Sequence, residues 1–447
     1  MEEERERLLR AAMSGRLSEV DELAHEVGDL PAKDLAVACT LCRADEALPL
    51  IAAATDVNQA LPPFDWPPLL YLCFSRLQRR PEAAAAACTI AEALIARGAQ
   101  VNAYKQEGSA AHPETALYGA AGVNANARLT ELLLAAGADP NDGTEEIGAE
   151  TIYHAAELPD NTCLRLLLAA GVARDKLSYC LGRKLDFEDP QGTALFLEAG
   201  ADPNFVTPFG SKDTRIHKAV RNDRSLFVLD LLLAAGGRTD VQDAEGATPY
   251  TLAVRMGRTF LMGRLLEAGA REEEADPLDV FLGVCARGDR SSARYLVQQQ
   301  PDLRAQASTN HADQLAAAAF EGRHKAVSLM LDLGFPPDAR GEFGSALHMA
   351  CWRGHADAVR ALVAGGADLE LANDFGGTPL DTAVFGAFNC HDPQGGMTTW
   401  GLPSDVQHGD YPGVARALLE AGADASVVND FPTGRADIDA VIAPWRP

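Results

Sequence analysis

The sequence predicts an all-α solenoid of stacked helix-turn-helix units with short β-turn fingers between them. Three observations predict this fold. A pair of short amphipathic helices recurs along the 447-residue chain, a Gly-Ala-Asp-like end closes the second helix, and Ala and Leu far outnumber the aromatic residues, which make up 6%. Because one such helix pair cannot bury its own apolar face, the copies must pack on one another.

The clearest copy runs from Ser345 to Asp368, and its apolar residues follow helical spacing. The first helix presents Leu347, Ala350 and Cys351, and the second presents Val359, Leu362 and Val363. Gly354 marks the turn between them, and Gly366 ends the second helix, where a residue without Cβ tolerates left-handed backbone. The pattern restarts at Leu380, 33 residues after Leu347.

Two segments of this pattern, Ser345-Ala-Leu-His-Met-Ala350 and Thr378-Pro-Leu-Asp-Thr-Ala383, resemble the T-P-L-H-x-A hallmark of the ankyrin repeat family. The resemblance implies a curved solenoid with a concave groove, lined by finger tips and by the first helix of each copy. It also implies that His217 and His348, at the histidine place of the hallmark, form structural hydrogen bonds between neighbouring fingers. We therefore assign them no catalytic role.

Read in order, twelve degenerate copies cover nearly the whole chain as a single solenoid. Their approximate bounds are 5–32, 33–60, 61–105, 106–145, 146–175, 176–208, 209–242, 243–275, 276–307, 308–340, 341–373 and 374–429. An insertion at 390–410 interrupts the last copy, and residues 430–447 are expected to form a C-terminal cap.

Two copies depart from the regular spacing. The third copy carries ten extra residues, which we expect to lengthen its helices. Only six residues separate Gly171 from Leu177, so the sixth copy should lack a finger on its N-terminal side, and we predict an irregular seam there.

The formal charge of −25 argues against binding to nucleic acid or an anionic membrane and favours a basic partner. Solubility alone is the simpler explanation of that charge. Cys39 and Cys42 form a lone C-x-x-C without a second pair, which predicts buried thiols rather than a zinc site. The charged N-terminus is no signal peptide and no run is long enough to span a membrane, so we expect a cytoplasmic protein.

One position on each first helix should face the groove. Through the twelve copies it reads Met13, Thr40, Phe74, Gly122, Glu157, Gly182, Arg221, Arg255, Ala286, Phe320, Trp352 and Phe385. The last three are neighbouring large aromatics, which are costly to expose unless a partner covers them, and Trp is a residue type that concentrates binding energy. Phe343 and Phe375, on nearby fingers, extend this predicted anchor. Alternatively, these rings fold against the fingers and support the groove wall.

The insertion and two groove arginines add further candidates. Arg221 and Arg255 are expected either to receive a carboxylate or phosphate or to pair with nearby acids such as Asp223 and Glu245. Trp400, in the insertion, is a candidate partner contact. The same insertion holds four weaker metal or acid–base candidates: His391, Asp392, His408 and Asp410. Their spacing matches no metal motif, so an ordinary surface loop is the simpler interpretation and we predict no metal.

These features favour a non-enzymatic, monomeric scaffold that binds a protein or peptide and needs no cofactor. There is no phosphate-binding Gly-rich loop, no Gly-x-Ser-x-Gly elbow and no HExxH, so no catalytic residue is assigned. Two alternatives stay open: a small-molecule or catalytic pocket between the groove and the insertion, and an acidic immunity or inhibitor protein that occupies a basic enzyme's site.

Overall fold

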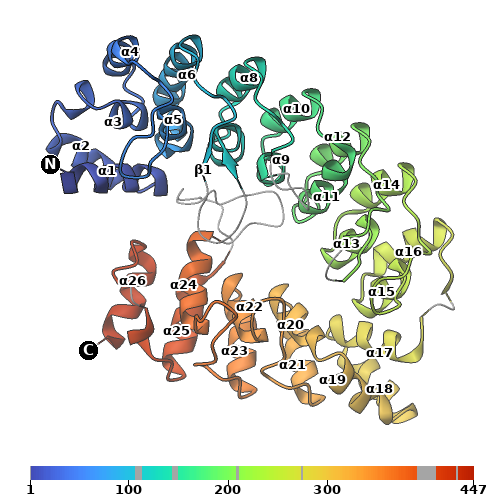
Figure 1. Cartoon of the computed structure of the whole chain (residues 1–447). Helices are drawn as coiled ribbons and strands as arrows, with labels where there is room; N and C mark the ends of the chain where they lie inside the picture. Colours follow the sequence, from blue (N-terminus) through green and yellow to red (C-terminus); the bar gives the residue numbers. More distant parts are fainter. Residues whose placement is uncertain are drawn as a thin grey trace. The chain divides into compact units, whose positions relative to one another are not determined.

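The computed structural model describes residues 2–105, 113–142, 150–207, 211–272, 275–389, 409–428 and 431–446. In these residues the chain is a succession of short helices with one two-stranded hairpin, which confirms the predicted all-α fold (Figure 1). The chain forms two compact units. Unit 1 lies within Met1–Phe205, and unit 2 lies within Val206–Asp392 and Pro403–Pro447.

Unit 1 begins with four helices and a 3-10 turn, and its hairpin follows the sixth helix. Its elements are α1 (Glu2–Ser14), α2 (Leu17–Glu26), η1 (Leu30–Ala32), α3 (Leu35–Thr40), α4 (Ala44–Ala53), α5 (Pro68–Phe74), η2 (Arg76–Arg79), α6 (Pro81–Ala96), β1 (Tyr104–Lys105), β2 (Glu114–Thr115), α7 (Ala116–Tyr118), η3 (Gly119–Val123), α8 (Ala127–Ala135), α9 (Glu150–Ala155), α10 (Thr162–Ala169), α11 (Arg174–Lys184) and α12 (Pro190–Glu198).

The described residues of unit 2 form helices, apart from one isolated bridge between Arg340 and Ser345. Its elements are α13 (Arg215–Arg221), α14 (Leu226–Ala234), α15 (Pro249–Arg255), α16 (Thr259–Glu267), α17 (Pro277–Ala286), α18 (Arg290–Gln299), α19 (Asp302–Asn310), α20 (Asp313–Phe320), α21 (His324–Asp332), α22 (Ala346–Trp352), α23 (Ala356–Ala364), α24 (Pro379–Asn389), α25 (Tyr411–Glu420), η5 (Ala425–Val427), α26 (Ala436–Ile442) and η6 (Ala443–Trp445).

Within each unit the helices form two layers. First helices stack on first helices, as in α3–α5–α7–α9 of unit 1 and α20–α22–α24 of unit 2. Second helices stack likewise, as in α4–α6–α8–α10 and α21–α23–α25 (Figure 1). The core is therefore a continuous apolar layer shared between copies, which is how a helical repeat buries surface that one pair cannot.

The copy around α22 and α23 shows why these residues make a helix pair. Leu347 and Leu362 are fully buried, one on each helix. Gly354 and Gly366 end the two helices with φ of 70° and 86°, which L-residues with a Cβ rarely adopt. The predicted apolar pattern thus coincides with the buried face, except that Val363 is only partly buried.

The irregular copies differ from the regular spacing in three ways. In the third copy the extra residues form the 3-10 turn η2 and a second helix, α6, that extends over Pro81–Ala96. The link between α10 and α11 is residues 170–173, with no finger. Between α18 and α20 an additional helix, α19, stands where a finger was expected.

Candidate functional site

Three rings of unit 2 form what we call the C-terminal aromatic row: Phe343, Trp352 and Phe385. The Trp352 ring lies 5.7 Å from the Phe343 ring, edge to face, and 5.7 Å from the Phe385 ring. Phe343 precedes α22, Trp352 is the last residue of α22, and Phe385 lies on α24, so the row spans two copies. Trp352 is partly buried, whereas Phe385 is 52% exposed.

Phe375 and Phe320 flank this row in different ways. The Asp374 amide donates a 3.0 Å hydrogen bond to the Phe343 carbonyl, which holds the turn carrying Phe375 beside the Phe343 turn. Phe375 itself is 85% exposed. Phe320 is partly buried, and the guanidinium of Arg353 lies 5.0 Å from its ring centroid.

The structure shows which carboxylates pair with Arg221 and Arg255. Arg221 pairs with two nearby acids, Asp213 at 2.7 Å and Asp243 at 3.0 Å, rather than with Asp223. Arg255 pairs with Glu245, as one interpretation expected, and also with Asp279. Both guanidinium groups are held by carboxylates of unit 2 itself, because burial requires a charge to be compensated. Pairing with nearby acids, one of the two interpretations of the sequence, is therefore the arrangement that both arginines adopt.

The structure corrects the predicted groove line at six of its twelve positions, which are buried: Thr40, Phe74, Glu157, Gly182, Arg255 and Ala286. The Thr40 carbonyl accepts a hydrogen bond from the Ser75 hydroxyl. The sequence analysis placed one exposed residue on every first helix, but the structure buries that position in half of the copies.

The insertion candidates Trp400, His391, Asp392 and His408 lie outside the described residues. Asp410 is described, and its carboxylate caps α25 by accepting a 2.8 Å hydrogen bond from the Gly413 amide. Among the residues that the structure describes, no group of three or more His, Cys, Asp and Glu is placed to hold a metal. Cys39 and Cys42 are buried, and burial raises the pKa of the Cys42 thiol to about 12.

Unit 1 contains a hollow that the sequence did not predict, which we call the N-terminal pocket. Its volume is about 640 Å³, within the range of small-molecule sites. Its lining comes from α1, α5, η2, the hairpin, α7, η3, α9 and the turns next to α1, α5 and α9. It consists of Arg10, Met13, Ser14, Arg16, Phe64, Trp66, Phe74, Arg76, Arg79, Lys105, Glu114, Tyr118, Gly122, Val123, His154 and Glu157.

One wall of the pocket is a chain of rings. Consecutive centroids are 4.7 Å apart between Phe64 and Trp66, 5.8 Å between Trp66 and Phe74, and 5.9 Å between Phe74 and Tyr118. The chain continues to His154, 5.1 Å from Tyr118. Rings at these separations gain contact energy beyond their buried area, which favours a rigid wall.

Cations line the same hollow. The Lys105 ammonium lies 4.6 Å from the Phe74 centroid and 5.2 Å from that of Trp66, and it pairs with Glu114 at 2.7 Å, its partner across the hairpin. Burial lowers the pKa of Arg76, and burial together with the Arg76 charge lowers the pKa of Arg79 to about 10.

The acidic side of the pocket is held by internal pairs. Burial alone would lower the pKa of His154, but contacts with the carboxylates of Glu150 (3.5 Å) and Glu157 (3.2 Å) raise it to about 9. Glu157 also pairs with Arg183 at 2.6 Å.

Sequence reasoning found part of this pocket without recognising it. Met13, Phe74, Gly122 and Glu157 all belong to the predicted groove line. It missed the cations, because Arg76 and Arg79 lie in the irregular third copy and Lys105 lies on a finger. The dipeptide Arg79-Arg80 and the cluster Phe64–Trp66, in an acidic chain poor in aromatics, were the available signals.

The two-layer stacking and the turns between copies define the class of protein: a helical-repeat solenoid. The chain belongs to the ankyrin repeat family, whose model, described as ankyrin repeats in many copies, matches residues 330–383. It is 36% identical over 114 residues to cyclin-dependent kinase 4 inhibitor B of Bos taurus, covering 25% of this chain and 85% of that protein.

Two longer relatives match as well. Ankyrin repeat and SAM domain-containing protein 6 of Danio rerio is 34% identical over 147 residues, covering 31% of this chain and 18% of its own length. E3 ubiquitin-protein ligase KEG of Arabidopsis thaliana is 24% identical over 280 residues, covering 58% of this chain. The chain spans less than a fifth of either protein, 18% and 17% of their lengths.

Among solved structures, the chain is similar to the human ASB11 ankyrin repeat domain, at 21% identity and a TM-score of 0.24, covering 54% of this chain and 96% of that one. The ankyrin repeat domain of Bcl-3 aligns at 22% identity and a TM-score of 0.25, covering 52% and 92%. No helix in the described parts of the chain is both long and apolar enough to cross a membrane.

Proposed function

We propose that this protein is a scaffold that binds a protein or peptide segment through the C-terminal aromatic row. The observation that carries the proposal is the contact of Trp352 with Phe343 and Phe385 across two copies, with Phe385 half exposed. An apolar side chain of the partner would cover Phe385 and the accessible part of Trp352. Binding energy is usually concentrated in a few aromatic residues of this kind.

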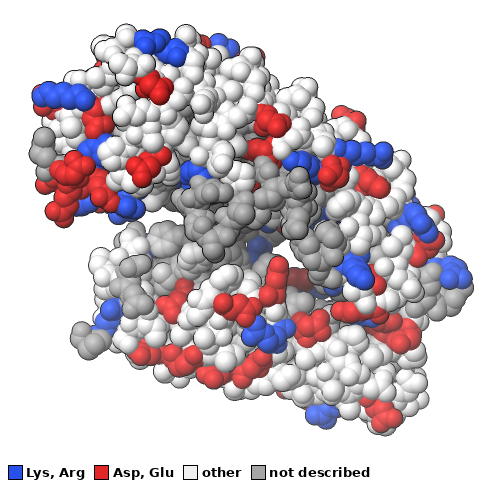
Figure 2. All heavy atoms as spheres, in the orientation of Figure 1, with Lys and Arg blue, Asp and Glu red and all other residues white. Residues whose placement is uncertain are grey.

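The charge of the chain favours a basic partner. On the face shown in Figure 2, red Asp and Glu side chains predominate over blue Lys and Arg on unit 2. Asp374 and Asp381 lie on the turn and the helix that carry Phe375 and Phe385. Complementary charge raises the rate of encounter and discriminates against acidic partners more than it adds affinity.

The experiment selects 12-residue peptides from a displayed random library on the intact chain. The affinity of the best peptide is then measured by fluorescence polarisation. We expect selected peptides to combine Lys or Arg with a large apolar residue, and Trp352→Ala to weaken binding at least about tenfold. Because Trp352 is only partly buried, the melting temperature of the Trp352→Ala variant should differ little from that of the wild type.

Phe260→Ala is the matched control, because Phe260 is an 82% exposed aromatic of unit 2 that belongs to α16 and not to the row. It should leave peptide affinity unchanged. Equal peptide affinity of Trp352→Ala and the wild type would rule out the row as the anchor.

A further inference from the structure

The charged side chains that line the N-terminal pocket are compensated within the protein. Three of the basic ones form ion pairs at 2.6 to 2.7 Å: Arg10 with Glu6, Arg16 with Glu19 and Lys105 with Glu114. Arg76 and Arg79 also interact with other residues of the chain. The carboxylate of Glu157 pairs with Arg183 at 2.6 Å. Because separating either of the two buried pairs, Lys105–Glu114 and Glu157–Arg183, leaves an uncompensated charge, a charged ligand is at a disadvantage in this pocket.

Cations of the chain also occupy positions over the aromatic rings. Ring faces attract a cation, and the Lys105 ammonium lies 4.6 Å from the Phe74 centroid and 5.2 Å from that of Trp66. The Arg10 guanidinium lies 5.2 Å from the Phe64 centroid. A cationic ligand would therefore meet like charges at the wall, whereas a neutral ring can pack on the ring surface that stays accessible. Phe64 and Trp66 are both partly exposed, which provides that surface.

Tyr118 adds one polar group to this wall. Its ring lies 5.9 Å from the Phe74 ring and is partly exposed. The Tyr118 backbone N–H donates to the Thr115 hydroxyl at 3.1 Å, but in the part of the chain that the structure describes the Tyr118 side-chain hydroxyl forms no hydrogen bond. Burial raises the pKa of this phenol, so it keeps its proton near neutral pH and can donate. A tyrosine hydroxyl in an apolar site usually has a partner, so this one is suited to an acceptor atom of a ligand.

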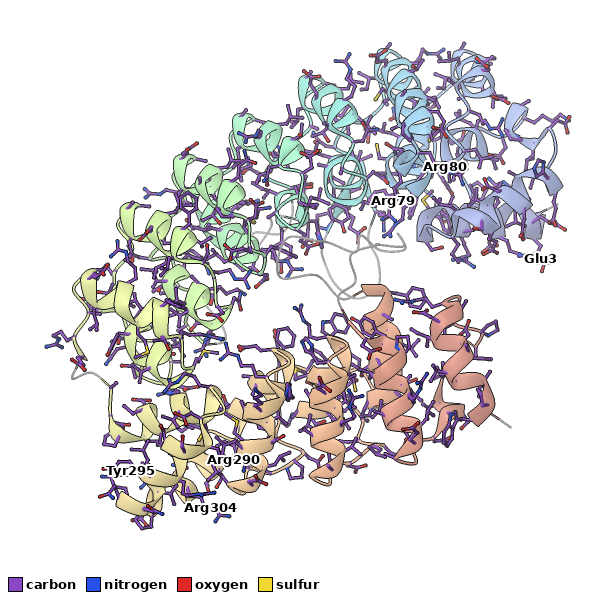
Figure 3. All side chains as sticks on the ribbon, turned by 180° about the vertical axis from the view of Figure 1, so that it is seen from behind. Glu3, Arg79, Arg80, Arg290, Tyr295 and Arg304 are labelled. Carbon is purple, nitrogen blue, oxygen red and sulfur yellow. The ribbon has the colours of Figure 1, made fainter. Side chains whose placement is uncertain are left out.

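We propose that the N-terminal pocket binds a neutral planar heteroaromatic compound, whose ring packs on the aromatic wall and whose ring nitrogen or carbonyl oxygen accepts a hydrogen bond from the Tyr118 hydroxyl. A hollow of about 640 Å³ accommodates a two-ring compound. Of the two adjacent arginines labelled in Figure 3, Arg79 lines this pocket, whereas Arg80 pairs with Asp21 at 2.8 Å. Stacking on aromatic side chains tolerates many rings, so the hydrogen bond supplies the discrimination among them.

Equilibrium dialysis of the intact chain near neutral pH with four compounds of the same ring shape tests the proposal. Quinoline is neutral and carries an acceptor nitrogen, and naphthalene is neutral without an acceptor. N-methylquinolinium carries a positive charge and 2-naphthoate a negative one. We expect quinoline to bind at least about tenfold more tightly than N-methylquinolinium, and naphthalene at least about tenfold more tightly than 2-naphthoate. No binding of quinoline, or a charged compound that binds as tightly as its neutral counterpart, overturns the proposal.

Tyr118→Phe and Tyr104→Phe are the matched variants, because Tyr104 is 56% exposed on β1 and is not part of the pocket lining. Tyr118→Phe should weaken the binding of quinoline about fivefold through the lost hydrogen bond and leave the affinity for naphthalene unchanged. Tyr104→Phe should change neither affinity. Equal losses for quinoline and naphthalene in Tyr118→Phe, or no loss for quinoline, would overturn the role of the hydroxyl.

Trp66→Leu gives a second measurement, because it shortens the aromatic wall and keeps the Tyr118 hydroxyl. It should weaken the binding of quinoline and naphthalene by similar factors, each at least about fivefold. If Tyr118→Phe fails to fold, the comparison of Trp66→Leu with Tyr104→Phe decides in its place, and unchanged affinity in Trp66→Leu overturns the proposal. The peptide site is tested by Trp352→Ala in unit 2, so failure of this proposal and failure of the proposed peptide site are separate results.

Discussion

Three histidines of unit 2, two of them buried and one partly buried, link neighbouring copies of the repeat. The Nδ1 atoms of His217 and His348 accept hydrogen bonds from the backbone N–H of Thr214 and Ser345, so each Nε2–H donates to the next turn. His217 reaches the Ala247 carbonyl at 3.0 Å and His348 the Gly377 carbonyl at 3.2 Å. This is the hydrogen bond that the family resemblance implied. Burial lowers the pKa of both rings, so they stay neutral where they support the stack.

The third histidine, His355, should make the stability of the protein depend on pH. Its Nε2–H donates to the Phe320 carbonyl at 3.1 Å, and burial with the nearby Arg353 charge lowers its pKa from 6.5 to about 4. A lowered folded-state pKa means that the unfolded chain binds the proton first as the pH falls. The contribution of His355 to the free energy of unfolding is therefore fully present above pH 6.5 and is lost progressively as the pH falls toward 4.

We expect His355→Gln to remove part of that decline, on the order of 2 kcal/mol between pH 7 and pH 4. The measurement is urea unfolding of both proteins across this range. Since carboxylates also titrate there, the difference between the two curves is the quantity of interest. Parallel curves would show that the ring is not protected from protonation in the folded state.

Close helix packing in unit 2 depends on glycines at defined positions. A Cβ on Gly283 of α17 would lie 2.0 Å from the Val254 carbonyl oxygen of α15, so only glycine permits this approach. Gly386 of α24 has the same relation to Trp352, whose carbonyl oxygen would lie 2.5 Å from an added Cβ. The second contact sets the position of α24, and with it Phe385, against Trp352.

We therefore expect alanine substitutions at two glycines in helices of unit 2 to change the free energy of unfolding in opposite directions. Gly283→Ala should destabilise the protein by about 2 kcal/mol, because α15 and α17 must separate. Gly263→Ala, on α16, should stabilise it by roughly 0.5–1 kcal/mol, since no atom lies within 4 Å of the added Cβ and alanine favours the helix. Urea unfolding measures both. Destabilisation by both variants to the same extent would contradict the packing argument.

At the scale of the whole molecule, each copy is stabilised by its neighbours rather than by one central core. In unit 2, α17 contacts α15, α19 and α21, and α22 contacts α20 and α24. Stability of such a stack is approximately a sum over copies and the interfaces between neighbours. A destabilising substitution in one copy should consequently lower the stability of the adjoining copies first.

Hydrogen exchange followed by mass spectrometry tests this expectation. In Gly283→Ala, amides of α15, α17 and α21 should exchange faster, whereas α25 and α26 should keep the protection they have in the wild type. Gly263→Ala is the control and should accelerate none of them. A uniform acceleration across unit 2 would instead indicate that it unfolds as one cooperative body.

The sequence by itself determined the helix pairs and their repetition, because apolar spacing and turn glycines act within about thirty residues. It also predicted the neighbouring Trp352 and Phe385, which occupy equivalent positions of adjacent copies. It did not predict that Arg221 is held by Asp213 and Asp243, since such pairs depend on how closely turns approach.

The N-terminal pocket was decided only by tertiary structure. Arg79 lies on an irregular turn, Lys105 on a hairpin and His154 on a later helix, and no periodic pattern relates them. They meet because stacking brings side chains from separate copies to one hollow. There, burial and neighbouring charges shift the pKa of His154, and Lys105 forms an ion pair with Glu114. A repeat pattern specifies which face each helix buries, but the contacts among exposed side chains follow from the distances between copies.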